Sequence, residues 1–227
     1  MKTVHAYAAK DSKSPLEPFE FTLPELGPEQ VDIRVEYCGI CHSDLSMLRN
    51  EWGMSAYPLV PGHEIVGRVE EVGSMVKSVK PGDRVGVGWF SGSCMTCPQC
   101  LGGDQNLCAK NEGVIVGRHG GFADLVRSHW IWTTPLPEAL PGESAGPLFC
   151  GGITVFNPIL EFNVRPTDRV GVIGIGGLGH LAVQFLNKWG CEVTAFSSNP
   201  DKSPELAKLG AHRVVDSRNS SALKAEA

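Results

Sequence analysis

The stretch DRVGVIGIGGLGHLAVQFLNKWGCEVTAFSS, residues 168–198, decides which fold this chain can form. Residues 168–176 are rich in valine and isoleucine, which predicts a buried strand. Residues 178–190 are predicted to form a helix that ends at Gly190, and residues 191–198 are predicted to form a second strand. A strand, a glycine turn, a helix and a strand in this order form the unit from which dinucleotide-binding sheets are built.

The turn itself, GIGGLG at residues 174–179, fits the pattern G-x-G-x-x-G. The chain contains 27 glycines, so the position of the pattern between a strand and a helix matters more than the pattern alone. Glycines let the backbone approach a pyrophosphate, and the helix N-terminus offers free N–H groups to the anion. The alternative is a tight turn that binds no ligand. The cofactor-binding residues predicted here are Gly174, Gly176, Gly177, Leu178 and Gly179.

The tip of the second strand indicates which dinucleotide binds. A site for NAD usually carries an acidic residue about twenty positions after the glycines, where it holds the ribose 2′-hydroxyl. Here the tip is Ser197-Ser198-Asn199, followed by Lys202. Hydroxyls and an ammonium group suit a 2′-phosphate, which a carboxylate would repel, so Ser197, Ser198 and Lys202 predict NADP(H). Asp201 is the exception, because a shift in register would bring its carboxylate near the ribose.

Two predicted domains divide the chain. Residues 212–218 are predicted to form a third strand with a helix after it, so residues 150–227 make one β-α-β-α-β half of a dinucleotide-binding domain. Residues 1–149 contain strand patterns such as those at 31–37 and 64–73. They are predicted to form a mostly β domain.

Four cysteines lie close together in SCMTCPQCLGGDQNLC, residues 93–108. The chain has eight cysteines and we expect no export signal in it, which favours metal ligands or free thiols over disulfides. Two glycines after the third cysteine allow the chain to turn back, so four thiolates can surround one Zn²⁺ and leave no position for water. The alternative is scattered thiols or a redox pair. The predicted structural zinc ligands are Cys94, Cys97, Cys100 and Cys108.

A second set of ligand types is spread over the segments CGICHSD, PGHE and FCGGITVF, which begin at residues 38, 61 and 149. They contribute Cys41, His63 and Cys150. Two thiolates and one imidazole would hold a zinc ion with an open fourth position, as in catalytic sites. A single buried cysteine or histidine is more often part of a core than a metal ligand. From the residues alone, both interpretations remain: a catalytic zinc site, or cysteines and a histidine that belong to the core.

The composition excludes several classes of function. The 227 residues are 42% hydrophobic and 20% charged, which fits one large or two small globular domains. A formal charge of -5 and a pI near 5.8 offer no basic surface to nucleic acid. The apolar run 170–186 contains many glycines and His180, so a strand and a helix explain it better than a membrane span. We expect a cytoplasmic protein with no nucleic-acid or membrane partner.

Together these residues resemble the zinc-dependent medium-chain alcohol dehydrogenases, and within them the cinnamyl-alcohol-dehydrogenase-like branch that includes bacterial NADPH-dependent aldehyde reductases. The resemblance covers nearly the entire chain. It rests on the motifs CGICHSDLS, NEWG, GWFSGSC, GPLFCGGITVF, VGVIGIGGLGH and VTAFSSNP. It implies a GroES-like β barrel over residues 1–149 that carries both zinc sites, followed by a partial α/β Rossmann domain over residues 150–227.

The resemblance also implies a role for each residue of the dispersed set. Cys41, His63 and Cys150 match the catalytic zinc ligands. Glu64 matches a carboxylate that can approach the metal when its ligands change. Asp44 matches the acid that hydrogen-bonds the histidine ligand and sets its tautomer.

Further positions match the proton path, the cofactor site and the substrate pocket. Ser43 matches the hydroxyl that delivers the proton, His42 a contact to a cofactor phosphate, and Thr154 a position beside the nicotinamide. Trp52 and Trp89 are candidates for the walls of an apolar substrate pocket, although each alone could equally be a core residue.

Two features depart from the family pattern. Many relatives carry a histidine where this chain has Ser46, so the part of Ser46 in the proton path is open. The family also continues beyond the position of residue 227 with the second half of the nucleotide-binding sheet, which carries much of the subunit interface. The chain is therefore interpreted as a fragment or a truncated form, and a homodimer is expected for the full-length protein.

The predicted function is the zinc- and NADPH-dependent reduction of aldehydes to primary alcohols, together with the reverse oxidation. The predicted cofactors are NADP(H), a catalytic zinc ion and a structural zinc ion. Other readings stay open: a secondary-alcohol or polyol dehydrogenase of the same superfamily, a zinc-free quinone reductase, and a truncated zinc-binding chain without turnover.

Overall fold

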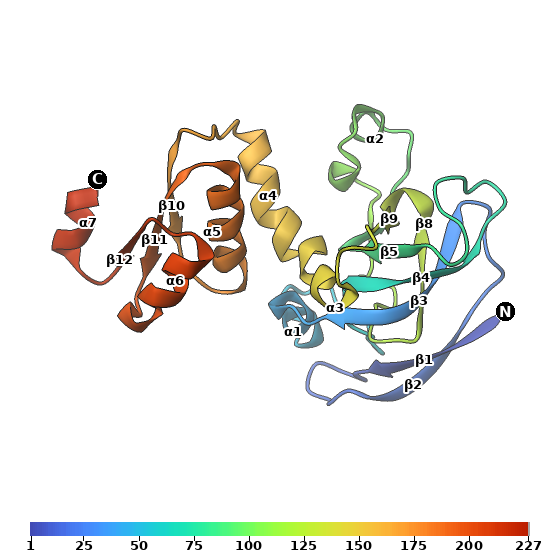
Figure 1. Cartoon of the computed structure of the whole chain (residues 1–227). Helices are drawn as coiled ribbons and strands as arrows, with labels where there is room; N and C mark the ends of the chain where they lie inside the picture. The colour runs from blue at the N-terminus through green and yellow to red at the C-terminus, as the bar shows by residue number, and fades with distance from the viewer. Residues whose placement is uncertain (227) are drawn as a thin grey trace. The chain divides into compact units, whose positions relative to one another are not determined.

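The computed structural model describes residues 1–226, which form two compact units that divide after Cys150 (Figure 1). The predicted boundary lay one residue earlier, before Cys150. Phe149, the residue before Cys150, packs its ring directly on Gly86 of the first unit. The contact is so close that a Cβ on Gly86 would lie 2.0 Å from the Phe149 ring. This contact keeps the end of the segment, and Cys150 with it, in the first unit.

The first unit is built on a five-stranded antiparallel sheet. In spatial order its strands are β8 (Leu125–His129), β3 (Gln30–Gly39), β4 (Glu64–Val72), β5 (Arg84–Val87) and β9 (Thr134–Pro135). The predicted strands at 31–37 and 64–73 correspond to β3 and β4, which pair with each other along nearly their full lengths. The start of β4 is buried, so residues placed there are held away from water.

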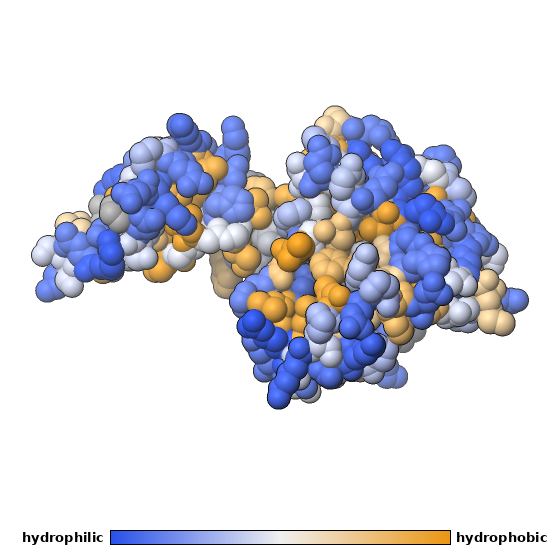
Figure 2. Space-filling model, turned by 90° about the horizontal axis from the view of Figure 1, so that it is seen from below, coloured by the Kyte–Doolittle hydropathy of each residue, from blue (hydrophilic) through white to orange (hydrophobic). Residues whose placement is uncertain are grey.

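Shorter elements surround this sheet. They are the hairpin of β1 (Lys2–Ala8) and β2 (Glu17–Leu23), the pair of β6 (Phe90–Gly92) and β7 (Glu112–Gly113), the helices α1 (His42–Leu48), α2 (Pro98–Gly102) and α3 (Gly142–Ala145), and the 3₁₀ helices η1 (Gln105–Leu107), η2 (Trp130–Trp132) and η3 (Gly146–Phe149). In Figure 2, hydrophobic residues gather on one face of this unit inside a rim of hydrophilic ones. A groove of about 900 Å³ between the hairpin and β3 is lined by Tyr7, Tyr37 and Phe122, among others.

The core of the first unit is apolar and has a buried ion pair beside it. Val31, Ile33 and Ile65 are fully buried. The Arg127 guanidinium donates to both carboxylate oxygens of Asp32, at 2.7 and 3.0 Å. Removing one partner of a buried pair leaves an uncompensated charge and costs about 3–5 kcal/mol. The pair therefore fixes β8 against β3, which in turn supports β4.

The second unit contains a parallel sheet in the order β10-β11-β12. Its elements are α4 (Gly151–Glu161), β10 (Arg169–Ile173), α5 (Gly177–Trp189), β11 (Glu192–Ser197), η4 (Pro200–Lys202), α6 (Ser203–Leu209), β12 (Arg213–Asp216) and α7 (Ser220–Glu226). The predicted β-α-β-α-β order is present, although each observed strand is shorter than predicted because the flanking residues lie in the turns. Gly190 ends α5 with a φ of 109°, a conformation that glycine adopts without strain.

The apolar run at 170–186 lies in β10, the glycine turn and most of α5. Val183 and Leu186 of α5 are buried with Val193 of β11 in the core of the second unit. Within residues 1–226, no helix combines the length and the apolar character that crossing a bilayer requires.

Candidate functional site

Cys41, His63, Glu64 and Cys150 come together in the first unit. Each offers one ligand atom, and these atoms lie within 4.8 Å of one another. The sulfur atoms of Cys41 and Cys150 are 3.8 Å apart, although the residues are 109 positions apart in the sequence. Cys41 is the N-cap of α1, and Cys150 follows η3. His63 and Glu64 stand at the start of β4, so three separate elements deliver the four side chains to one place.

Asp44 holds this group in position. Its carboxylate oxygen Oδ1 accepts hydrogen bonds from His63 Nδ1 at 2.9 Å and from the Gly62 N–H at 2.8 Å. Its other oxygen accepts from the Cys41 N–H at 3.0 Å, which caps α1. In the neutral imidazole with the Nδ1 proton donated to Asp44, His63 Nε2 carries a lone pair for a metal ion, and this buried nitrogen has no hydrogen-bond partner among the described residues.

The donor set fits a zinc ion. Burial opposes a charge on His63, but the hydrogen bond to Asp44 and the neighbouring Cys150 sulfur raise its pKa to about 10. Burial also raises the pKa of the Glu64 carboxyl. At His63 and Glu64, both shifts favour added positive charge and disfavour added negative charge. Thiolates, an imidazole nitrogen and a carboxylate are the ligands that zinc takes in proteins.

Asp44→Asn is expected to weaken metal binding at this group by about 10–100-fold, the usual effect of losing a partner behind a histidine ligand. The three groups that bond the Asp44 carboxylate are all hydrogen-bond donors. In the asparagine variant the amide NH₂ group is also a donor, so it would face another donor and at least one of these hydrogen bonds would be lost. Competition with a chelator would measure the zinc affinity. Ser46→Ala is the control on the same helix, because the Ser46 hydroxyl donates to Glu51 instead, at 2.7 Å. Equal affinity in the Asn variant and the parent chain would rule out this role for Asp44.

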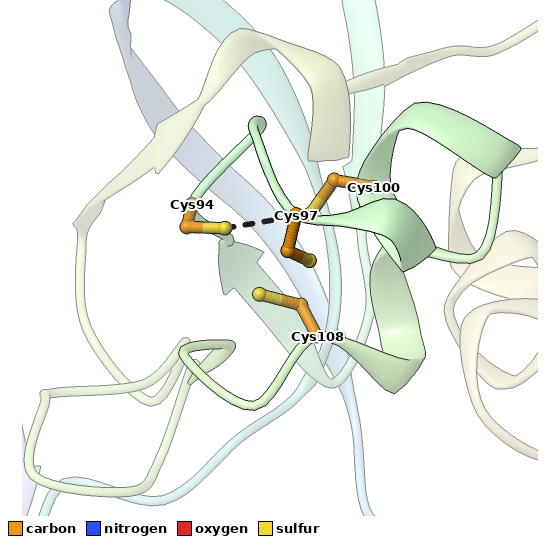
Figure 3. A group of neighbouring side chains, drawn as sticks. All are labelled: Cys94, Cys97, Cys100 and Cys108. Atoms are coloured by element: carbon orange, nitrogen blue, oxygen red, sulfur yellow. Dashed lines mark hydrogen bonds between the residues drawn. The ribbon is translucent and has the colours of Figure 1, made fainter.

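The four cysteines of residues 94–108 form a second group, with sulfur atoms within 4.8 Å of one another. Figure 3 shows the four side chains pointing toward a common centre. Pro98 opens α2 directly after Cys97, and Gly103 ends it with a φ of 95°, which turns the chain back toward Cys108. Hydrogen bonds from the N–H groups of Thr96 and Cys97 lower the pKa of Cys94 to about 6. All four cysteines are free of disulfides, and four thiolates in this arrangement suit a closed tetrahedral site.

The glycine turn of the second unit has the geometry that a phosphate requires. Gly174 has a φ of 85°, and a Cβ on Gly179 would lie 2.2 Å from the Gly174 carbonyl oxygen. Gly176 and Gly177 instead face open space, with no atom within 4 Å of a Cβ placed on either one. Because α5 begins at Gly177, its first N–H groups are free for an anion in that space.

The residues after β11 lie near this turn. The Lys202 ammonium donates to the carbonyl of Ile175, inside the glycine turn, at 3.3 Å. Ser198 is exposed. Ser197 is buried, and its hydroxyl pairs with the Asn199 backbone at 3.2 Å, which shapes the bend after the strand. Lys202 and Ser198 are therefore the more accessible of the three polar residues predicted here.

Trp89 connects the dispersed metal group with an aromatic surface. Its ring lies 5.1 Å from the His63 ring and 5.9 Å from the Trp52 ring, measured between centroids. Trp89 also lines a cavity of about 350 Å³, together with Met54 and Val116. These two residues carried no signal in the sequence, because single apolar residues outside a motif do not distinguish a pocket from a core.

The remaining predicted residues lie at the starts of two helices. Ser43, in the first turn of α1, hydrogen-bonds the Cys41 thiol and helps to lower its pKa against the effect of burial. His42 is exposed at the beginning of α1, and Thr154 is exposed on α4.

The chain matches known families over both units. Residues 27–138 match the alcohol dehydrogenase GroES-like domain, and residues 177–227 match the zinc-binding dehydrogenase family. The aldehyde reductase AdhA of Synechocystis sp. is 57% identical over 220 residues, which cover 97% of this chain and 66% of that protein. The chain thus spans slightly less than two thirds of this relative's length.

The solved structures that share the fold include two cinnamyl alcohol dehydrogenases. A cinnamyl alcohol dehydrogenase from Sorghum bicolor superimposes with a TM-score of 0.93 at 41% identity, over 99% of this chain and 67% of that one. The cinnamyl alcohol dehydrogenase of Helicobacter pylori, solved as a complex with NADP(H), has a TM-score of 0.89 at 32% identity, over 93% of this chain and 64% of that one.

A GroES-like unit with two groups of zinc-ligand side chains, followed by a β-α-β unit with a glycine turn, defines a dehydrogenase of the medium-chain class. The chain belongs to the zinc-dependent medium-chain alcohol dehydrogenase family, in its cinnamyl-alcohol-dehydrogenase-like branch. The predicted fold class, a GroES-like barrel followed by part of a Rossmann domain, is confirmed by these matches.

Proposed function

We propose that this chain is part of an enzyme that reduces aldehydes to primary alcohols with NADPH, and oxidises the alcohols in the reverse direction. The observation that carries the proposal is the group of Cys41, His63 and Cys150, in which the buried His63 keeps its Nε2 free because Nδ1 is paired with Asp44. The name of the Synechocystis relative, aldehyde reductase, supports the same reaction.

Cys41, His63 and Cys150 would hold the catalytic metal ion, with the Glu64 carboxylate beside them. Zinc bound there would supply a Lewis acid that polarises the aldehyde oxygen. The chain contributes rigidity: Asp44 fixes the imidazole, and the packing of Phe149 on Gly86 fixes the segment that ends at Cys150. Burial of His63 and Asp44 lowers the local dielectric constant, which strengthens every electrostatic interaction in the site.

Ser43 would hold the proton that the product oxygen receives. Hydride addition to the carbonyl carbon leaves a negative oxygen, so a hydroxyl group must lie near the metal ligands to protonate it. Ser43 meets this requirement, since its hydroxyl bonds the thiol of Cys41. The Ser46 hydroxyl donates to the Glu51 carboxylate. We therefore propose that Ser46 stabilises the end of α1 and takes no part in the proton path.

Cys94, Cys97, Cys100 and Cys108 would hold a structural zinc ion. Four cysteine ligands fill a tetrahedral site and leave no position for water or substrate. This site would fix the lobe that joins β6 to β7 and take no part in the reaction.

NADP(H) is the proposed dinucleotide. The glycine turn would hold the pyrophosphate, while Ser198 and the Lys202 ammonium would contact the 2′-phosphate. Ser197 would support the bend that presents them. His42 and Thr154 are proposed as further contacts to the cofactor. The Helicobacter pylori relative was solved with NADP(H), which supports this choice.

Lys202→Glu is expected to raise the KM for NADPH by about tenfold or more, because a carboxylate would replace an ammonium beside a phosphate. The KM for NADH should change little or fall, since NADH has no 2′-phosphate. Lys208→Glu makes the same charge change on exposed α6 and is the matched control. A parallel rise in both KM values would mean that Lys202 does not select the 2′-phosphate.

Oxidation of NADPH with a panel of aliphatic and aromatic aldehydes tests the proposed reaction. It should be measured on the 227-residue chain and on a chain extended to the length of the relatives. If only the longer chain turns over, the site assignments stand and the added segment is necessary for activity. A preference for secondary alcohols or polyols would favour the second candidate reaction, and zinc binding without turnover by either chain would exclude an enzyme.

We also propose that the longer protein is a homodimer and that it is cytoplasmic. All eight cysteines are free, as expected of a chain in a reducing compartment. Light scattering on the longer chain would test the dimer.

A further inference from the structure

Cys150 depends on its neighbours for its position. It follows η3 with a φ of -123° and a ψ of -80°, which is neither helical nor extended, so no regular element fixes it. Its N–H donates to the Pro147 carbonyl at 3.4 Å, which is a long hydrogen bond. Cys41, in contrast, caps α1, and His63 stands at the start of β4. The contacts of the residues before Cys150 therefore decide where its sulfur lies.

One face of β5 makes several of these contacts. Side chains alternate between the two faces of a strand, and Val85 and Val87 of β5 are buried in the core of the first unit. Arg84, Gly86 and the next residue in the alternation, Gly88, therefore share the opposite face, the glycine face of β5. Its two glycines allow another segment of the chain to lie directly on the strand.

The segment before η3 is held by its own contacts. The Arg84 guanidinium donates to the carbonyl oxygens of Pro137 and Leu140. Further along the chain, Gly146 packs so closely on β4 that a Cβ there would lie 2.8 Å from the Glu64 carbonyl oxygen. The segment is therefore fixed at its beginning and in its middle before it reaches the metal ligands.

Phe149 holds the end of the segment in two different ways. Its ring covers Gly86, where a Cβ would lie 2.0 Å from Cζ and 2.1 Å from Cε2. Its backbone rests on Gly88, where a Cβ would lie 2.6 Å from the Phe149 carbonyl oxygen. Real Cβ atoms essentially never come closer than 3.0 Å, so a side chain at Gly88 forces the two apart by at least about 0.4 Å. Because β5 is paired on both sides, the Phe149 carbonyl moves, and the planar peptide bond passes the shift to Cys150.

We propose that Gly88 is a positioning residue for the Cys150 thiolate, and that the glycine face of β5 sets where this thiolate meets the metal ion. The inference rests on the proposed metal site of Cys41, His63 and Cys150. Gly88 acts through Phe149, so it is not a catalytic residue. Its effect is expected to be large, because functional geometry tolerates displacements of only about 0.5 Å.

Gly88→Ala is expected to weaken zinc binding at this site by about 10–100-fold, the usual effect of losing a group that orients a metal ligand. Competition with a chelator on the 227-residue chain measures this affinity. Alkylation by iodoacetamide, followed by mass spectrometry of the peptides, shows which thiol has been released. Zinc occupies the thiolate that would react, so Cys150 should react slowly in the zinc-loaded parent and about tenfold faster or more in Gly88→Ala. General unfolding would instead expose the buried Cys191 as well.

Gly102→Ala is the matched control, because it adds the same methyl group at an exposed helix residue whose Cβ would meet one atom, 4.0 Å away. It should leave the zinc affinity and the labelling of Cys150 unchanged. Gly86→Ala should expose Cys150 as Gly88→Ala does. Adding Phe149→Leu to Gly86→Ala should restore most of the protection, since it removes the two ring atoms nearest to the new Cβ. The same addition should not rescue Gly88→Ala, whose contact is with the Phe149 backbone.

Parent-like zinc affinity and Cys150 labelling in Gly88→Ala would overturn the inference and leave the proposed reaction untouched. Should Gly88→Ala not fold, parent-like labelling in Gly86→Ala would overturn it equally. If zinc does not slow the alkylation of Cys150 in the parent, the ligand assignment fails and the inference fails with it. A chain that shows the expected labelling but reduces no aldehyde, even when extended, would refute the proposed reaction and support the inference.

Discussion

Cys150→Ala is expected to reduce the zinc content from two ions to one, because the chain has two groups of zinc ligands and Cys150 belongs to one of them. It is also expected to lower kcat/KM for aldehydes by about 1,000-fold or more. The loss is large because Lewis-acid stabilisation of the transition state contributes several kcal/mol, and about 1.4 kcal/mol corresponds to a factor of ten. The two thiolates and the imidazole form one ligand set, so removing one of them leaves too few ligands. Zinc content by mass spectrometry and NADPH oxidation by the extended chain would measure both effects.

The control for this variant is Cys191→Ala. Cys191 is also a buried free cysteine, but it lies in the second unit with its thiol on the Arg165 carbonyl. It should keep both zinc ions and most of the activity. The fold of Cys150→Ala should be largely retained, because Cys150 is only partly buried. Retention of both zinc ions in Cys150→Ala would refute the ligand assignment.

Cys100→Ser is expected to have the largest effect on stability. Structural zinc sites contribute on the order of 10 kcal/mol of binding free energy to folding, and the lobe of α2 and η1 has little apolar core of its own. A loss of only about 3 kcal/mol would lower the melting temperature of a domain this size by roughly 10 °C. We expect a fall of at least this size, loss of one zinc ion, and new protease cleavage between residues 93 and 111.

Gln99→Ala is the matched control, because Gln99 is the exposed neighbour of Cys100 on the same helix. It should leave the melting temperature and zinc content unchanged. A Cys100→Ser chain with the melting temperature and protease resistance of the parent would show that the lobe does not depend on metal.

The two variants should differ in kind because the two groups are built differently. The four-cysteine group lies within one lobe, so its loss releases that lobe. The group around His63 is assembled from α1, β4 and η3, and the core of the first unit holds these elements in place without the metal ion. Loss of Cys150 should therefore remove the reaction and leave the framework.

Local features of this protein were determined by the sequence alone. The glycine turn and the four-cysteine lobe each occupy a short stretch, in which residue spacing and backbone geometry limit the possible arrangements. The order of strands and helices in the second unit also followed from local pattern, since burial and helix ends leave a signal in neighbouring residues. Strand ends in the second unit were overestimated by one to three residues, because the local pattern does not mark the residue at which strand pairing stops.

Only the tertiary structure decided which distant residues meet. Cys41 and Cys150 are brought within 3.8 Å by the packing of η3 on the sheet, and no local pattern encodes that distance across 109 positions. The same holds for Ser197, which is buried and whose hydroxyl bonds the Asn199 backbone, so that it forms part of a bend. Short-range geometry is set by a few backbone angles, whereas long-range contact depends on how whole elements pack, which a single sequence does not display.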